Sequence, residues 1–92
     1  MDPCSEKLKI LSNPQRLKIL EIIAKDKLNV SEINEKIDIP QNLLSYHLKV
    51  LEENEFIEGV RAGKHIIYQK TANLSSQGNK LSINLKCCEL KF

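Results

Sequence analysis

The spacing of apolar residues changes along this chain of 92 residues, and that change limits the folds it can adopt. As far as about residue 55, leucines and isoleucines recur at three- and four-residue intervals, the period of amphipathic helices. From Phe56 onward the helical period stops, and short runs rich in β-branched and aromatic residues, separated by a glycine-containing turn, have the character of strands. A helical region that precedes a β region in so short a chain predicts one mainly α domain of the α+β class.

Breaks in the helical pattern predict four helices. Ser5 is the expected N-cap of the first, and Pro14 suits the first turn of the second, where its missing N–H costs nothing. Ser31 is the expected cap of a short third helix, and Pro40 fits the first turn of the fourth. The expected helices span residues 5–11, 14–26, 31–37 and 41–55. Because only a short turn separates the last two, they predict a helix-turn-helix unit.

A β-hairpin is expected directly after the fourth helix, with strands at 56–61 and 65–69 around the turn Ala62-Gly63-Lys64. Residues 71–80 are polar, and we expect residues 75–79 to form a loop. The segment 81–92 predicts one C-terminal strand, because apolar and polar residues alternate at its start. Its alternating residues are Leu81, Ile83, Leu85 and Cys87, while Cys88, Leu90 and Phe92 fall on the opposite face. That second set indicates burial on both sides of the strand or a bulge.

Composition favours a soluble globular protein, since 41% of the residues are hydrophobic and 28% are charged. A net charge of +2 is too small to identify a nucleic-acid partner unless the cations gather on one face. No apolar run approaches the roughly 20 residues that span a bilayer. The first residues also lack the apolar stretch of a signal peptide. We therefore expect a cytoplasmic protein with no membrane partner.

Three motifs in this order resemble those of the ArsR-type (arsenic-repressor-like) winged helix-turn-helix regulators. They are Leu11–Leu20 (LSNPQRLKIL), Ser45–Leu51 (SYHLKVL) and Gly63–Tyr68 (GKHIIY). The likeness runs from about Glu6 to Gln69 and points to a short prokaryotic or archaeal member. It implies a single winged helix-turn-helix domain over 1–92, with a core at 5–70, in which the hairpin is the wing. It further implies a homodimeric repressor that binds a double-stranded operator with pseudo-twofold symmetry.

Polar residues of the fourth helix whose phase faces away from its leucines are the expected DNA-binding residues. They are Gln41, Asn42, Ser45, Tyr46 and Lys49. Gln and Asn can pair with adenine, Ser and Tyr can donate to bases or phosphates, and Lys49 suits phosphate. Around the hairpin turn, Arg61, Lys64 and His65 suit the DNA backbone or minor groove. His47 lies close to the apolar face, and we expect it to be packed and hydrogen-bonded rather than to contact bases.

Cysteines are the candidates for an effector site, because the resemblance implies that many family members release DNA on binding a soft metal or metalloid. Two family arrangements do not fit: Val30–Ile37 contains no Cys or His, and the C-terminal segment contains no His. Cys4, Cys87 and Cys88 are left as candidate ligands for a soft metal or metalloid ion. Adjacent residues of a strand point to opposite faces, so Cys87 and Cys88 need a bend to share an ion. Redox sensing and plain burial of these thiols are the alternatives.

The family's usual dimer uses the first helix and a final helix, whereas this chain ends in an expected strand. We expect 81–92 either to extend the wing sheet or to pair with its twin in a dimer. An alternative function is a winged-helix protein-interaction module that does not bind specific DNA. An enzyme is not expected, because both His residues fall within the DNA-binding unit and no phosphate-binding glycine loop is present.

Overall fold

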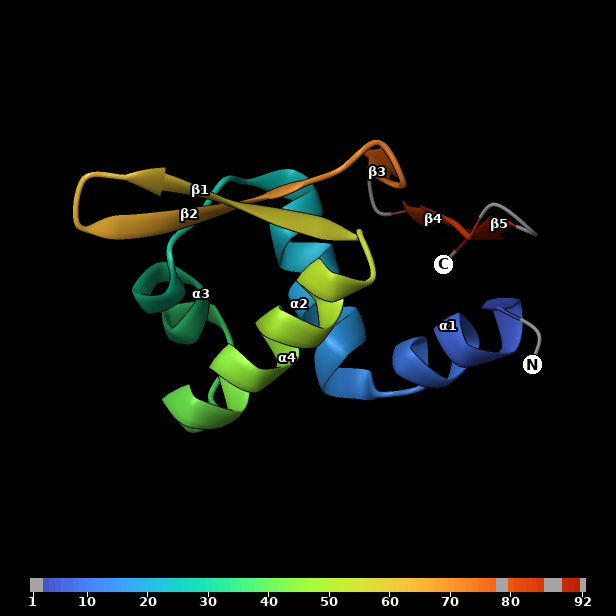
Figure 1. Ribbon diagram of the computed structural model, residues 1–92, viewed down its shortest axis with the longest axis horizontal. Coiled ribbons are helices and arrows are strands. Elements are labelled where there is room, and N and C mark those ends of the chain that lie inside the picture. Colours follow the sequence, from blue (N-terminus) through green and yellow to red (C-terminus); the bar gives the residue numbers. More distant parts are fainter. Residues whose placement is uncertain (1–2, 78–79, 86–88, 92) are drawn as a thin grey trace.

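Four helices are followed by five strands in the computed structural model, which describes residues 3–77, 80–85 and 89–91 (Figure 1). The helices are α1 (Pro3–Leu11), α2 (Pro14–Lys25), α3 (Val30–Lys36) and α4 (Gln41–Glu53). The strands are β1 (Ile57–Ala62), β2 (His65–Lys70), β3 (Leu74–Gln77), β4 (Lys80–Asn84) and β5 (Glu89–Lys91). The expected α+β class and the order of helices before a hairpin are therefore confirmed.

Two of the expected helix N-caps, Ser5 and Ser31, are wrong. Helix α1 begins at Pro3, so Ser5 lies within the helix and does not cap it. Helix α3 begins after Asn29, whose side chain accepts from the Glu32 N–H at 2.9 Å. The Glu32 carboxylate in turn accepts from the Asn29 N–H at 2.9 Å, which completes a capping box. Ser31 is exposed inside this helix.

The end of α4 sets the direction in which the hairpin leaves the helical part. Glu55 has a left-handed backbone with a φ of 63°, and its N–H donates to Glu52 O. The next N–H, of Phe56, donates to Leu51 O at 3.1 Å. This pair of bonds is the Schellman arrangement that closes helices. The helix therefore ends at Glu53, two residues before the end expected from its apolar pattern.

Strands β1 and β2 form an antiparallel hairpin in which Ala62 pairs with His65. The turn between them consists of Gly63 and Lys64, and Gly63 has a φ of 62°. A glycine with positive φ at the first turn position matches a type II′ turn, whose twist suits the two strands. Leu28, between α2 and α3, bonds to Tyr68 on the other edge of β2 through two main-chain hydrogen bonds. The hairpin is thereby attached to the helical part.

The C-terminal region differs from the expected loop and single strand. Strands β3, β4 and β5 form a separate antiparallel sheet in that order, so this segment does not extend the wing. Part of the expected loop is β3, because Leu74 is an apolar anchor that is buried. The chain reverses between β4 and β5, and Leu90 therefore pairs with Ile83 on the same face of the sheet. The expected placement of Leu90 on an opposite face is wrong for that reason. Cys87, Cys88 and Phe92 lie outside the described residues.

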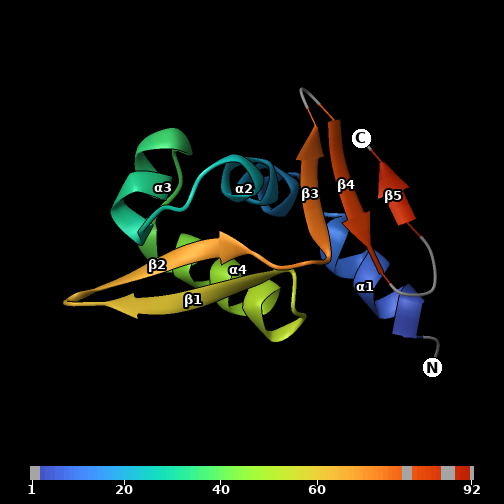
Figure 2. The same ribbon diagram turned by 90° about the horizontal axis from the view of Figure 1, so that it is seen from above.

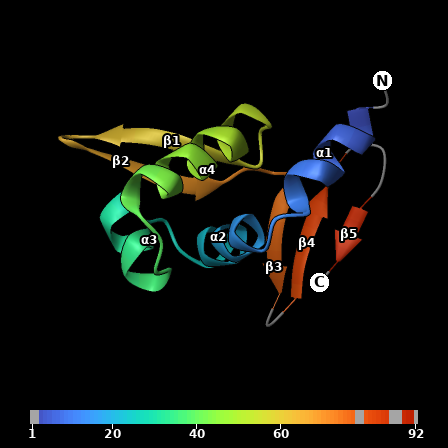
Figure 3. The ribbon, with the colours of Figure 1, turned by 90° about the horizontal axis from the view of Figure 1, so that it is seen from below.

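A single cluster of aliphatic side chains joins the helices to both sheets. It includes Leu44, Leu48 and Leu51 of α4, each fully buried as expected from their spacing. Ile83 is also fully buried, so the C-terminal sheet contributes to the same core. The wing turn and α3 lie at one end of the molecule, whereas α1 and the C-terminal sheet lie at the other (Figures 1, 2 and 3). Within the described residues, no helix is long and apolar enough to cross a bilayer.

Candidate nucleic-acid interface

The outer face of α4 carries the five residues that the sequence indicates for DNA contact. Gln41, Asn42, Ser45, Tyr46 and Lys49 are all exposed, and Tyr46 retains 55% of its accessible surface. We call these five residues the recognition surface. The C-terminal sheet lies at the far end of the molecule and does not cover it (Figure 3). Within the described residues of a single chain, the recognition surface is therefore accessible to another molecule.

The side chain of Asn34 bonds to the segment that connects α3 to α4. The amide Nδ2 of Asn34 donates to Ile37 O at 3.1 Å and to Ile39 O at 2.9 Å. These bonds tie down the turn that connects the two helices. Pro40 occupies the N-cap position, one residue before the first helical turn expected for it, and no side chain caps that turn. Main-chain N–H groups at such a helix start are suited to phosphate oxygens.

His47 is packed into the protein, as the sequence predicts. It retains 3% of its accessible surface, and its Nδ1 accepts from Arg16 Nε at 3.0 Å. The proton therefore belongs on Nε2, which lies 3.0 Å from Gln15 Oε1 and donates to it. Burial, and secondarily the charge of Arg16, lower the pKa of His47 below its ordinary value of 6.5. His47 is a neutral link between α2 and α4.

Acidification is expected to destabilise the protein through His47. The unfolded chain binds a proton on this residue near pH 6.5, whereas the folded chain, whose His47 pKa is lower, does so only at lower pH. The free energy of unfolding should therefore fall as the pH is lowered through 6.5, until the folded pKa is passed. Urea titrations at several pH values, on the wild type and on His47→Gln, measure this effect. An identical pH dependence in both proteins would contradict it.

The wing carries its cations on different faces. Arg61, Lys64 and His65 are all exposed. Arg61 shares a face of the hairpin with Gly59, whose N–H donates to Glu52 Oε2 of α4 at 3.0 Å. His65 pairs with Ala62 on the other face. Arg61 is therefore on the side of the wing that faces α4, and His65 is not.

Gly59 lies too close to its neighbours for a larger residue. A Cβ at this position would lie 2.8 Å from Ile66 Cγ2 and 3.1 Å from Glu52 Oε2. Gly59→Ala is therefore expected to displace the side chains of Ile66 and Glu52 and to lower the free energy of unfolding by about 1–3 kcal/mol. Denaturant titration measures the loss, with the exposed wing residue Ala62, changed to Ser, as the control. Equal stability of the two variants would contradict the predicted clash.

Comparison with known proteins identifies the family. A family model described as a helix-turn-helix domain matches residues 11–60, more than half of the chain. The arsenical resistance operon repressor of Staphylococcus xylosus is 36% identical over 62 residues, which cover 67% of this chain and 60% of that protein. The biofilm growth-associated repressor of Xylella fastidiosa (strain 9a5c) is 32% identical over 84 residues, or 91% of this chain and 74% of that repressor. The chain belongs to the ArsR-type family of winged helix-turn-helix regulators.

A solved structure supports the same assignment of fold. The homodimeric winged helix-turn-helix DNA-binding domain Mb0332 of Mycobacterium bovis is 26% identical, with a TM-score of 0.69. The match covers 75% of this chain and 64% of that one. This ArsR-type chain spans about half the length of the first curated relatives that it matches. Those relatives are repressors rather than enzymes, in agreement with the expectation from the sequence.

The candidate effector ligands of this ArsR-type chain stay predictions. Cys4 lies in α1, whereas Cys87 and Cys88 are outside the described residues. Across residues 3–77, 80–85 and 89–91, no group of three or more Cys, His, Asp and Glu side chains lies close enough to hold a metal ion. No site for such an ion is therefore built from the described side chains alone.

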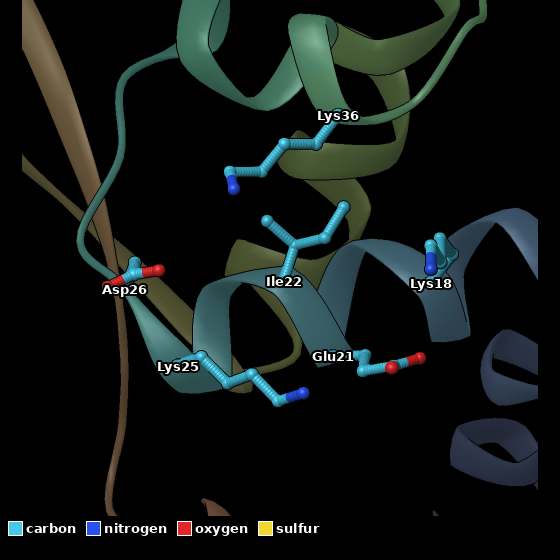
Figure 4. A pocket seen from close by; sticks show the side chains of 6 residues that line it. All are labelled: Lys18, Glu21, Ile22, Lys25, Asp26 and Lys36. Atoms are coloured by element: carbon cyan, nitrogen blue, oxygen red, sulfur yellow. The ribbon is translucent and has the colours of Figure 1, made fainter. Parts of the chain in front are cut away.

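A shallow pocket of about 230 Å³ lies on the outer face of α2 (Figure 4). Three lysines and two carboxylates surround Ile22 there, and one of these lysines, Lys36, extends from α3. The other charged residues of the pocket are Lys18, Glu21, Lys25 and Asp26. Because cations and anions are interspersed, the pocket favours neither sign of ligand. The pocket belongs to neither α4 nor the wing, so its lysines are suitable controls for DNA-binding variants.

Proposed function

We propose that this protein is a sequence-specific DNA-binding repressor that acts in the cytoplasm as a homodimer. The observation that carries the proposal is the recognition surface, five polar residues exposed on a helix that is anchored by buried leucines. A helix of this kind fits the major groove of B-DNA, where side chains reach base edges. The wing follows α4 and projects from the helical part (Figure 2), and its exposed cations are further candidates for contact with the duplex.

Each part of the surface has a distinct role in the proposal. Gln41, Asn42 and Ser45 begin α4 and contact base edges, for which amide and hydroxyl groups are suited. Lys49, a turn further along, contacts phosphate. Arg61 and Lys64 contact the backbone or the minor groove beside the site, and His65 takes part only from the outer face of the wing. Phosphate contacts position the protein, and base contacts select the sequence.

The proposed dimer interface lies at the end of the molecule that carries α1 and the C-terminal sheet. Leu8 of α1 is 42% exposed there, and an apolar side chain of this kind gains from burial against a second copy. The related domain Mb0332 is homodimeric. This end lies away from the wing turn (Figure 1), which leaves both recognition surfaces of a dimer free for adjacent half-sites. Sedimentation of the wild type and Leu8→Lys tests the interface, and unchanged association of the variant would contradict it.

A soft metal or metalloid effector stays part of the proposal. Thiolates favour such ions, and Cys4 belongs to α1, which lies at the same end of the molecule as the C-terminal sheet (Figure 2). Cys87 and Cys88 follow β4 by three and four residues in the sequence. Zn(II), As(III) or an oxidant, added separately to the DNA complex, should each be tested for release. Release that Cys87→Ser and Cys88→Ser abolish would support these ligands, and release that both variants retain would contradict them.

A binding assay on the duplex upstream of the protein's own gene tests the function directly. Specific binding should weaken as salt rises, because phosphate contacts release condensed counterions. A protein that neutralises about five phosphates should show a slope of about −4 to −5 in log K against log salt. A scrambled duplex of equal length is the control. Absence of salt-dependent binding would favour the alternative, a winged-helix module that recognises another protein.

A further inference from the structure

Arg16 of α2 contacts both α1 and α4 through its guanidinium group. Its Nε donates to His47 Nδ1 of α4 at 3.0 Å, and its Nη1 donates to Ile10 O in the last turn of α1 at 3.3 Å. The same guanidinium lies over the ring of Tyr46, 5.8 Å from the ring centroid. Arg16 is half-buried, so its guanidinium group is partly shielded from solvent where it makes these contacts.

The imidazole of His47, which accepts from Arg16, is also hydrogen-bonded through its second ring nitrogen. His47 has one ring nitrogen bonded to Arg16 and the other to Gln15 Oε1. Its ring also lies 5.7 Å from the Tyr46 ring, with the two planes tilted by 50°. Among the described residues, no buried side-chain N or O atom lacks a hydrogen-bond partner. A fully bonded cluster of this kind favours one arrangement of its members.

Tyr46 needs such support, because it belongs to the recognition surface and more than half of it is exposed. An exposed tyrosine has several rotamers available, and a groove contact requires one of them. The guanidinium of Arg16 and the ring of His47 limit the positions open to the Tyr46 ring. The phenol is therefore set in place before DNA arrives, which reduces the entropy lost on binding.

We propose that Arg16 is a positioning residue for DNA recognition, which acts through Tyr46 and His47 rather than through its own contact with phosphate. This assignment rests on the proposed function, since it concerns how the recognition surface is arranged. It is specific to Arg16: Lys18, two residues along α2, lies on the outer face and lines the pocket of Figure 4. Lys18 carries the same charge, and the other residues that line this pocket belong to α2, to Asp26 after it and to α3.

A double-mutant cycle in operator affinity tests the assignment. Arg16→Gln should weaken specific binding about tenfold, within the range of coupling between residues in contact. In a Tyr46→Ala background the same change should have little further effect, because the residue that Arg16 positions is gone. The salt dependence of binding should be the same in Arg16→Gln as in the wild type. Lys18→Gln, the control for charge, should bind like the wild type.

Two outcomes of the cycle would overturn the proposal. An undiminished effect of Arg16→Gln in the Tyr46→Ala background would show that Arg16 acts without Tyr46. A salt slope lower by about 0.9 would show that Arg16 neutralises a phosphate itself. If Arg16→Gln melts below the assay temperature, His47→Gln replaces it in the same cycle. That variant removes the imidazole ring that accepts from Arg16 Nε and lies beside the Tyr46 ring, while leaving Arg16 in place, and the same loss of additivity is expected.

Nuclear magnetic resonance of the DNA-free protein separates this proposal from the proposed function. Arg16→Gln should shift the Tyr46 ring resonances and raise the pKa of His47, because a neighbouring positive charge is removed. Lys18→Gln should do neither. Unchanged Tyr46 resonances would overturn the role of Arg16 alone. Absence of operator binding by the wild type would instead overturn the DNA-binding function, and the positioning role with it.

Discussion

Replacing Ser45 and Tyr46 together by alanine is expected to lower the affinity for operator DNA by about 30-fold or more. Each side chain is exposed on α4, and loss of a specific contact costs about 1–3 kcal/mol. Two such losses, at about 1.4 kcal/mol for each factor of ten, give this range. The thermal midpoint should hardly change, since exposed substitutions alter stability by about 0.5 kcal/mol or less. Titration of labelled operator and of a scrambled duplex measures both the affinity and the specificity.

Lysine variants supply a matched control for this experiment. Lys49→Ala and Lys25→Ala each remove one exposed helical cation, the first from α4 and the second from the outer face of α2. The first should weaken binding to all duplexes and reduce the salt slope by about 0.9, while the second should change neither. Equal effects of the two lysines would mean that general charge, and not the face of α4, drives binding. Unaltered operator affinity in Ser45→Ala/Tyr46→Ala would remove the proposed contact surface.

The helical half of the fold follows from sequence because its apolar period is long and regular. Leu44, Leu48 and Leu51 mark one face of α4, and each of them is fully buried. Helix starts are harder to predict, because several polar residues compete as caps. Near α3, both Asn29 and Ser31 are good caps, but only Asn29 has a glutamate three residues further on to complete a capping box. That spacing was a signal available in the sequence.

The C-terminal sheet was harder to predict, because alternation alone does not show where a strand reverses. The pattern from Leu81 to Leu85 predicts β4 correctly, but the turn between β4 and β5 restarts the alternation. Leu74 is a single apolar residue in a polar stretch, which gave little reason to expect β3. The third strand becomes evident only when Leu74 pairs with Ile83.

Local sequence patterns also do not predict which residues of the site contact each other across different helices and strands. The burial of His47 follows from its place near the leucine face of α4. Its partner Arg16 lies 31 residues earlier, and no local spacing connects the two. The same holds for Glu52 and the Gly59 N–H, which depend on how the hairpin folds back on α4. The sequence therefore predicts which residues face outward, but it does not predict what positions them.

Removal of residues 81–92 is expected to prevent stable folding of the domain as a whole. Leu81, Ile83 and Leu85 are buried, with Ile83 fully so, and burial of each such side chain contributes about 1.5–3 kcal/mol. Their combined loss is of the order of the whole stability of a small domain, about 5–15 kcal/mol. Strand β3 would also lose its pairing partner and present a free edge for aggregation. Expression yield, circular dichroism and sedimentation of the shortened chain measure this outcome.

A single substitution separates the structural role of this sheet from its proposed role in the dimer. Ile83→Ala should lower the free energy of unfolding by about 2–5 kcal/mol, because Ile83 lies on the central strand and pairs with both Leu74 and Leu90. Ser75→Ala, on the exposed face of the same sheet, should stay within about 0.5 kcal/mol of the wild type. A shortened chain that folds but stays monomeric would assign the segment to the interface rather than to the core. A shortened chain that remains a tight, folded dimer would contradict both roles.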